Sequence, residues 1–323
     1  MGSFRILLAP VLAWLLLFPA ALGSDASPRD LLAAGRADEA IRTLQARLNS
    51  NPKDGESYHL LSRAYYAVQD WDHAVANGEK AVALDPNKSE YHLWLGRAYG
   101  EKADNSSWWT AAGLAKKVRT EFERAVELSP NSVDARSDLA EFYLEAPGIV
   151  GGGLDKARAQ AATLAKLDSA KAHWVNARIA EKSKDAAAAE REYRAYLEAG
   201  KNQADGWLNL ALFYRRAGRL DDMEAAIAKA TSAEVKKSDV LVDAAQTLLR
   251  AGRDFPAAIQ LLRRYISSGR TVEDAPVFKA HYLLGTLLEK QGDKRGAATE
   301  YRAALDLAQG FSAAQQALKR VSR

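Results

Sequence analysis

Three arginines have the residue type and spacing that point most directly to chemistry. Arg63 and Arg97 are 34 positions apart, and Arg178 takes the same place in a later repeat of the sequence. A guanidinium group forms two parallel hydrogen bonds to a carboxylate. Side by side on one surface, these arginines predict a groove that receives an acidic or C-terminal peptide segment. The alternative is a solvated or internally paired row, because exposed ion pairs are common and weak.

The adjacent residues Trp108 and Trp109 form a second candidate binding feature. Tryptophan buries a large area and is enriched at binding hot spots, so the pair could anchor a partner or a ligand. Local packing is the more common outcome, and we expect one of the two rings to fold back onto the hairpin that the pair interrupts. Both residues are kept as candidate partner-binding residues beside that expectation.

A glycine-rich stretch, Gly148 to Gly153, stands directly before a helix expected to begin near Leu154. Backbone N–H groups in such a loop can bind a phosphate, and Lys156 is close in sequence. The spacing of a nucleotide-binding P-loop is nevertheless absent, since Asp155 precedes the lysine and the segment before the glycines has a helical pattern. We therefore expect a structural loop.

No motif for catalysis, for a metal or for a cofactor stands out. The five histidines are scattered one to a repeat and show no metal-ligand spacing. Cysteine is absent, which excludes disulfides, thiolate metal sites and cysteine nucleophiles. Lys and Arg exceed Asp and Glu by 45 − 41 = 4 and the two signs are interleaved, unlike a nucleic-acid-binding protein. The sequence predicts a non-enzymatic protein with no cofactor.

The first residues have the pattern of a secretory signal peptide, predicted for residues 1–23. A positive start that ends at Arg5 precedes an apolar run from Ile6 to Phe18, and small residues allow cleavage before Ser24. The run is shorter than the roughly 20 residues that a membrane span requires. The cleavage region lacks the cysteine of a lipoprotein. We expect a periplasmic or secreted mature chain without a membrane span.

These candidate residues must be positioned by a repeat of 34 residues. Tyr58, Leu61 and Tyr65 share one helical face, and Ala74 and Ala81 share the next. Each period therefore predicts two amphipathic helices, in which small residues permit close packing. The pairs of identical residues 34 positions apart are Ala40 and Ala74, Pro52 and Pro86, Leu61 and Leu95, Arg63 and Arg97, and Tyr65 and Tyr99.

The pattern resembles the tetratricopeptide repeat, which places large apolar, small and turn residues at fixed positions of a 34-residue unit. The matching residues in three units are Tyr58, Leu61, Tyr65, Ala74, Ala81 and Pro86; Trp207, Leu210, Ala211, Tyr214, Gly218 and Ala230; and Leu284, Gly285, Gly292, Ala297, Tyr301 and Ala304. The stretch from Phe142 to Gly153 is similar to a Phe-Tyr-Leu-x-Ala-Pro-Gly-x-x-Gly-Gly segment of exported bacterial members.

The resemblance implies an all-α fold, a right-handed α-solenoid of about eight helix-turn-helix repeats over residues 24–323. It also implies a protein or peptide partner bound in the concave groove by first-helix residues. The expected units are about 25–54, 55–88, 89–132, 133–169, 170–203, 204–237, 238–277 and 278–311, with a cap helix at 312–323.

Two functions stay open at this level. The first is a protein-binding scaffold, with the cell envelope as its setting. The second is a ligand-binding or enzymatic protein that uses the insertions at 101–117 and 146–154, which belong to consecutive units and could meet in space. A deep pocket between them, with a perturbed ionisable group, favours the second. A self-assembling structural element is a third possibility, although the cap helix argues against it.

Overall fold

The computed structural model describes residues 26–200, 203–232 and 239–323, and these residues form seventeen α-helices. The predicted signal peptide, residues 1–23, lies outside the described residues. Among the described residues there is no strand beyond an isolated bridge between Val272 and Ala275. None of the described helices combines the length and apolarity needed to cross a membrane. The all-α prediction is confirmed.

The helices form eight antiparallel pairs, which stack in chain order as a solenoid. The first helices of the pairs are α1 (Pro28–Ala33), α3 (Gly55–Ala67), α5 (Ser89–Asp104), α7 (Val133–Glu145), α9 (Ser169–Lys182), α11 (Gln203–Arg216), α13 (Asp239–Ala251) and α15 (Val277–Lys290). The second helices are α2 (Ala37–Ser50), α4 (Trp71–Leu84), α6 (Trp108–Leu128), α8 (Leu154–Leu167), α10 (Ala186–Ala199), α12 (Leu220–Ser232), α14 (Phe255–Ser268) and α16 (Lys294–Leu307). The cap helix α17 (Ser312–Val321) follows, and a 3₁₀ turn, η1 (Gly148–Val150), precedes α8.

Small residues allow the helices to approach closely. A Cβ on Gly96 would lie 2.5 Å from the ring of Phe122, so α5 and α6 touch where only glycine fits. The Ser62 hydroxyl donates to the Ala74 carbonyl at 2.7 Å, which ties α3 to α4. N-cap aspartates such as Asp70 begin several second helices by accepting a backbone N–H of the first turn. The periodic small and acidic residues therefore account for the pairs.

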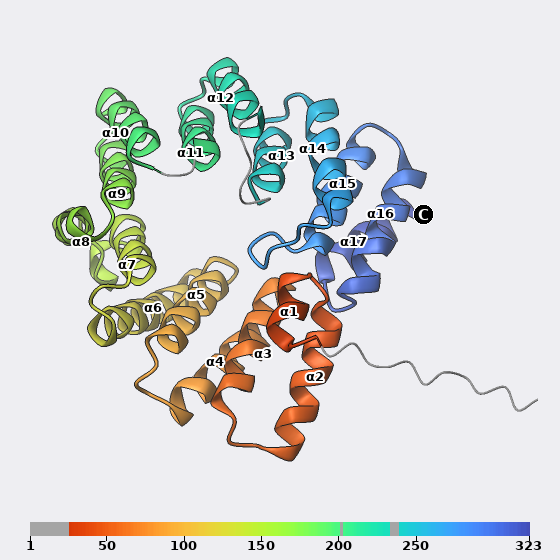
Figure 1. Cartoon of the computed structure of the whole chain (residues 1–323), viewed down its shortest axis with the longest axis horizontal. Coiled ribbons are helices and arrows are strands. Elements are labelled where there is room, and N and C mark those ends of the chain that lie inside the picture. The colour runs from red at the N-terminus through yellow and green to blue at the C-terminus, as the bar shows by residue number, and fades with distance from the viewer. Residues whose placement is uncertain (1–25, 201–202, 233–238) are drawn as a thin grey trace, which may run out of the picture.

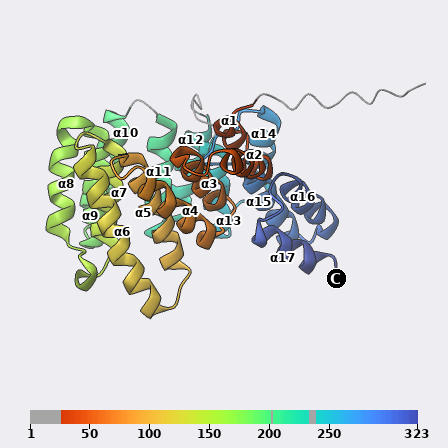
Figure 2. The same ribbon diagram turned by 90° about the horizontal axis from the view of Figure 1, so that it is seen from below.

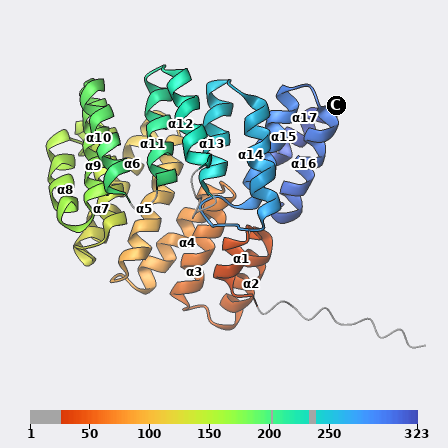
Figure 3. The same cartoon turned by 45° about the horizontal axis from the view of Figure 1, so that its top comes forward.

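The solenoid bends into a ring, with the first helix of each pair toward its inner side (Figure 1). The N-terminal pair meets the C-terminal pairs, as a tilted view also shows (Figure 3). Val68 and Phe278 belong to an apolar cluster that joins the two ends, and the ring of Phe278 packs on that of Phe311 with centroids 5.4 Å apart. The Gln309 N–H also donates to the Asp38 carboxylate at 2.8 Å. The ends of the solenoid are thus in contact.

The first insertion lengthens two helices instead of forming a loop. Helix α5 has 16 residues and α6 has 21, whereas α3 and α4 have 13 and 14. The surplus makes one end of α6 project past the neighbouring helices (Figure 2). The second insertion forms η1 and the glycine turn that follows it. The two insertions therefore flank α7.

Candidate functional site

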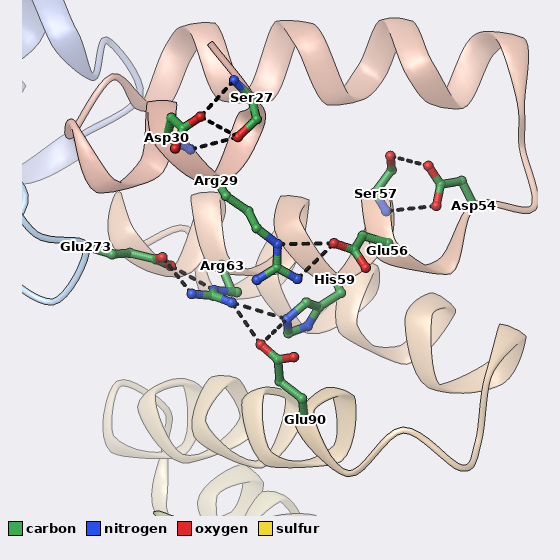
Figure 4. Close-up of polar contacts among 10 residues, drawn as sticks. All are labelled: Ser27, Arg29, Asp30, Asp54, Glu56, Ser57, His59, Arg63, Glu90 and Glu273. Carbon is green, nitrogen blue, oxygen red and sulfur yellow. Dashed lines mark hydrogen bonds and ion pairs between the residues drawn. The ribbon is translucent and has the colours of Figure 1, made fainter.

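Arg63 is the centre of a paired cluster on the inner side of the ring (Figure 4). Its Nε and Nη2 donate to the two carboxylate oxygens of Glu273 at 2.7 and 2.6 Å, which is a bidentate ion pair. Its Nη1 donates to Glu90 at 3.0 Å. Glu273 lies in the segment between α14 and α15, so the pair connects the two ends of the solenoid. Only 13% of the Arg63 side chain is exposed to solvent.

Arg97 lies beside Arg63, with the Trp94 ring between them. The guanidinium carbons of Arg63 and Arg97 lie 4.6 and 4.9 Å from the centroid of that ring, within cation–π range. Arg97 donates to Asp138 at 2.6 Å. The three side chains border a cavity of about 490 Å³, to which Asp274 also contributes. We call Arg63, Trp94, Arg97 and this cavity the arginine groove.

The third predicted arginine, Arg178, is placed further along the wall and is also paired. It donates to Glu141 at 2.9 Å and to Glu145 at 2.8 Å. Burial opposes the charge of Arg178, but the hydrogen bond and charge of Glu141, with the charge of Glu181, together outweigh this, and the pKa of Arg178 is raised above its ordinary value. Glu141, which interrupts the row of arginines in the sequence, is the partner of Arg178.

Electrostatics in the arginine groove favour the ionised states. A hydrogen bond with His59 is the main reason that the pKa of Glu90 is lowered to about 2, and the charge of Arg63 acts in the same direction. Burial opposes the charge on Arg97, yet Asp138 keeps the pKa of Arg97 above its ordinary value. The groove is thus a set of satisfied ion pairs contributed by the chain itself.

A second cavity, of about 670 Å³, lies between α5, α6, α7 and η1, where the two insertions meet. We call it the insertion pocket. Helix α6 supplies much of its apolar wall through Ala111, Ala115, Val118 and Phe122. Its volume is in the range of roughly 300–1,000 Å³ typical of ligand sites. The sequence left open whether the insertions at 101–117 and 146–154 meet in space. Residues of both line this cavity, so they do meet.

The rim of the insertion pocket carries exposed apolar side chains. Trp108 is 70% exposed, Trp109 is 80% exposed and Ile149 is 90% exposed. The two indole rings contact each other edge to face, with centroids 4.3 Å apart. The prediction that one tryptophan packs onto its own hairpin is therefore wrong. Trp108 borders the pocket beside the last turn of α5 and remains mostly exposed.

Carboxylates border the same pocket in excess. Its charged lining consists of Arg97 and five acids, which are Glu101, Asp104, Asp138, Glu141 and Glu145. Burial is the main reason that the pKa of Glu101 is raised, and the charge of Asp104 adds to this effect. The only hydrogen bond to the Glu101 side chain among the described residues is the one from the Tyr66 hydroxyl, at 3.4 Å. The pocket thus contains a perturbed ionisable group.

The last three glycines of the turn use their N–H groups for hydrogen bonds within the chain. The N–H of Gly151 donates to Gly148, that of Gly152 to Pro147 and that of Gly153 to Tyr143, at 3.0, 3.2 and 2.8 Å. Lys156 donates to the Gly151 carbonyl at 2.9 Å. The turn therefore closes on itself and supports η1 as a wall of the insertion pocket.

The histidines take part in contacts between helices. His59 lies 3.2 Å from Glu90 and His92 lies 2.6 Å from Glu121. His173 and His281 each lie 2.7 Å from a glutamate of the second helix of their own pair. In the part of the chain that the structure describes, no three His, Asp or Glu side chains gather as a metal site.

Some residues of these two sites gave only a weak signal in the sequence. Trp94 stands three positions before Arg97, a helical spacing that could have placed both on one face. Glu273 is 210 positions from Arg63, and no local pattern connects such distant residues. Asp104 and Ile149 each lie inside an insertion, outside the repeat that assigns residues to faces.

The comparisons with known proteins concern the repeats. A family model described as tetratricopeptide repeat matches residues 29–88 and 242–311, so these segments are tetratricopeptide repeats. Cellulose synthase operon protein C of Escherichia coli (strain K12) is 46% identical over 61 residues, which cover 19% of this chain and 5% of that protein. The chain thus matches a small part of that relative's length.

Two solved structures are similar in outline. A thermophilic tetratricopeptide protein of Thermus thermophilus has a TM-score of 0.48 at 21% identity, covering 58% of this chain and 96% of that one. A tetratricopeptide repeat protein from Parabacteroides merdae has a TM-score of 0.43 at 15% identity, covering 83% and 99%.

Proposed function

We propose that this tetratricopeptide-repeat solenoid is a non-enzymatic scaffold that binds a protein or peptide partner, and that the insertion pocket is its binding surface. One observation carries the proposal. Three of the five large apolar side chains that are exposed among the described residues, Trp108, Trp109 and Ile149, gather around one cavity. Exposed apolar residues gathered in this way mark interaction sites on soluble proteins.

The apolar surface is larger than the pocket, which supports a macromolecular partner. Trp108 and Ile149 line the cavity, whereas Trp109 lies outside it on the projecting turn of α6. A small ligand inside the cavity would leave Trp109 in water. A peptide that enters the cavity and continues over α6 would cover all three side chains, and buried aromatic anchors contribute much of the free energy of binding.

The ion pairs of Arg63, Arg97 and Arg178 support a structural role for these three arginines. Their guanidinium groups already hold carboxylates of the same chain, so an acidic partner would have to displace them. Truncating one member of a partly buried ion pair is costly because it leaves the other charge unpaired. We propose that the groove arginines stabilise the ring and that partner binding occurs at the insertion pocket.

We further propose that the protein acts in the cell envelope as an exported member of its family. The signal-peptide pattern of residues 1–23 supports this location, as does the stretch from Phe142 to Gly153. N-terminal sequencing of the chain from a fractionated Gram-negative host tests it. Mature protein that begins at Ser24 in the periplasmic fraction is the expected result, and an uncleaved chain in the cytoplasm would contradict it.

A small apolar ligand is the second candidate occupant, favoured by the cavity of about 670 Å³ and by the half-buried Glu101, whose pKa is raised. Affinity capture from envelope extract separates the two candidates when wild type is compared with Trp108→Ala and Trp109→Ala. Leu84→Ala is the matched control, since Leu84 is a 41% exposed apolar residue on α4.

The scaffold proposal predicts that the same partner is lost with either tryptophan variant and retained with the control. Loss with Trp108→Ala alone would favour a ligand confined to the cavity. Retention of the partner by both tryptophan variants would overturn the assignment of the binding surface.

A further inference from the structure

We infer that the insertion pocket binds a cationic apolar segment, in which a large apolar side chain stands next to a lysine or an arginine. This inference rests on the proposed function and specifies the chemistry of the partner. The apolar wall of α6 and the exposed rim provide the contact for the apolar side chain. The negative charge of the pocket lining favours a lysine or an arginine next to that apolar side chain.

The charges that remain after internal pairing are negative. Arg97 is paired with Asp138, and Glu145 is paired with Arg178 and with Lys182, the latter at 3.1 Å. Glu101 and Asp104 have no ion pair among the described residues. The pocket therefore has two carboxylates without an ion pair at the end of α5, the half-buried Glu101 and the exposed Asp104. The charge of Lys279, which does not line the pocket, acts on Glu101 only through space.

Asp104 stands where a carboxylate is unfavourable. It is the last residue of α5, and the negative end of the helix dipole repels its charge. No side chain in the described residues forms an ion pair or a hydrogen bond with it. A cation brought by a partner would relieve this repulsion and would interact with the half-buried Glu101 at the same time.

Glu141 supplies a third acceptor in the pocket. Its Oε1 accepts from Arg178, whereas its Oε2 is buried and has no hydrogen-bond partner. A buried acceptor without a donor costs roughly 1–3 kcal/mol. An ammonium or guanidinium group offers several donors, so a cationic side chain in the pocket suits a lining rich in carboxylates, to which Glu141 adds its negative charge.

The same charges disfavour other occupants of the pocket. An acidic peptide would meet the carboxylates of Glu101 and Asp104 without a free cation. An anionic lipid surface would meet the same repulsion, even though paired tryptophans suit a membrane interface. A basic apolar peptide satisfies both the apolar rim and the negative lining.

Selection from a library of random dodecapeptides on immobilised full-length mature protein tests the inference. Peptides retained by wild type and lost with Trp108→Ala are expected to be enriched in a large apolar residue adjacent to Lys or Arg. A synthetic peptide of that consensus should bind the double variant Glu101→Gln/Asp104→Asn at least tenfold more weakly. Its affinity for wild type should fall as salt concentration rises, because screening weakens charge attraction.

The double variant Asp155→Asn/Asp221→Asn is the matched control. It makes the same change in net charge at side chains that are 97% and 95% exposed, away from the pocket, and should retain the affinity of wild type. Circular dichroism of each variant checks that the helices are intact.

The outcomes of the selection distinguish the inference of a cationic partner from the proposed binding surface. Trp108-dependent peptides without basic residues, or equal affinity in Glu101→Gln/Asp104→Asn, would overturn the cationic inference and leave the binding surface in place. Selected peptides that bind Trp108→Ala and Trp109→Ala as well as wild type would overturn the proposed function. Binding of phosphatidylglycerol-containing vesicles through the tryptophans, without peptide enrichment, would overturn both in favour of a lipid surface.

Discussion

The arginine groove and the insertion pocket lie on neighbouring helices and share Arg97, yet they differ in what already satisfies them. In the groove, both predicted arginines have a carboxylate of the same chain within hydrogen-bond distance. In the pocket, Asp104 has no ion-pair partner among the described residues and Trp108 is 70% exposed. The arginines of the groove are paired without a ligand, whereas the pocket presents an exposed tryptophan beside carboxylates without an ion pair.

This difference shows how binding residues can be told from structural ones in a repeat protein. Arginine at a repeated position invites a functional interpretation, but stacking of repeats also brings carboxylates into reach of it. Residues inside insertions escape this pairing because the neighbouring units have no equivalent to pack against them. Exposed apolar side chains and unpaired carboxylates such as Trp108 and Asp104 therefore occur where the repeat is broken.

The largest effect is expected from Gly152→Ala, which should disrupt the insertion pocket and leave the arginine groove intact. A Cβ at this position would overlap the Ala146 carbonyl oxygen, so the turn and η1 must move. We expect a loss of roughly 1–3 kcal/mol in unfolding free energy, from strain, together with loss of peptide binding at the insertion pocket. Chemical denaturation and peptide titration measure the two effects.

Gly148→Ala is the control for this variant, because a Cβ there meets nothing within 4 Å. It should retain both stability and binding. Full peptide binding by Gly152→Ala would show that η1 is not a working wall of the pocket.

A smaller effect is expected from Glu273→Gln, which tests whether the groove is closed by its own carboxylate. The change weakens the bidentate pair with Arg63 and should cost about 1–2 kcal/mol, a range in keeping with charged hydrogen bonds. The ends of the ring should separate more easily, which small-angle scattering detects as a larger radius of gyration. A fluorescent poly-glutamate peptide should bind this variant and not wild type.

Asp274→Asn provides the comparison for Glu273→Gln, since it removes the same charge from the adjacent residue and leaves the pair with Arg63 intact. An unchanged radius of gyration in Glu273→Gln would assign closure of the ring to the apolar cluster in which Ala37 and Val68 meet Phe278 and Phe311.

The sequence predicted the elements of the molecule better than its site. Periodic residues such as Tyr58, Leu61 and Ala74 report helix faces, and the all-α solenoid follows from local spacing alone. The contact of Arg63 with Glu273 depends on how far the solenoid bends, which is the sum of small rotations between repeats. The exposure of Trp108 depends on the insertion extending α6, and composition does not distinguish a longer helix from a longer loop.

The smallest effect is expected from Asp243, which lies on the inner side of the ring and outside the insertion pocket. Replacing it tests how much a carboxylate outside the pocket affects stability. Enclosure within the ring is the main reason that its pKa is raised to about 6. The charged residues that act on it are Asp239, Asp274, Asp205, Arg250 and Lys279. Since the pKa of Asp243 is higher in the folded state than in the unfolded state, protonated Asp243 stabilises the fold. This contribution is fully present below about pH 4, the range of an unperturbed Asp. It is lost as the pH rises through about 6.

Asp243→Asn should therefore be more stable than wild type at pH 7, and the difference should shrink toward pH 4. The gain should be about 1 kcal/mol or less, because the side chain is exposed and solvent screens its charge. Thermal unfolding of both proteins across this pH range measures it. A difference that is the same at pH 4 and pH 7 would mean that repulsion from the surrounding acids is negligible. Peptide binding should not change, because Asp243 does not line the insertion pocket.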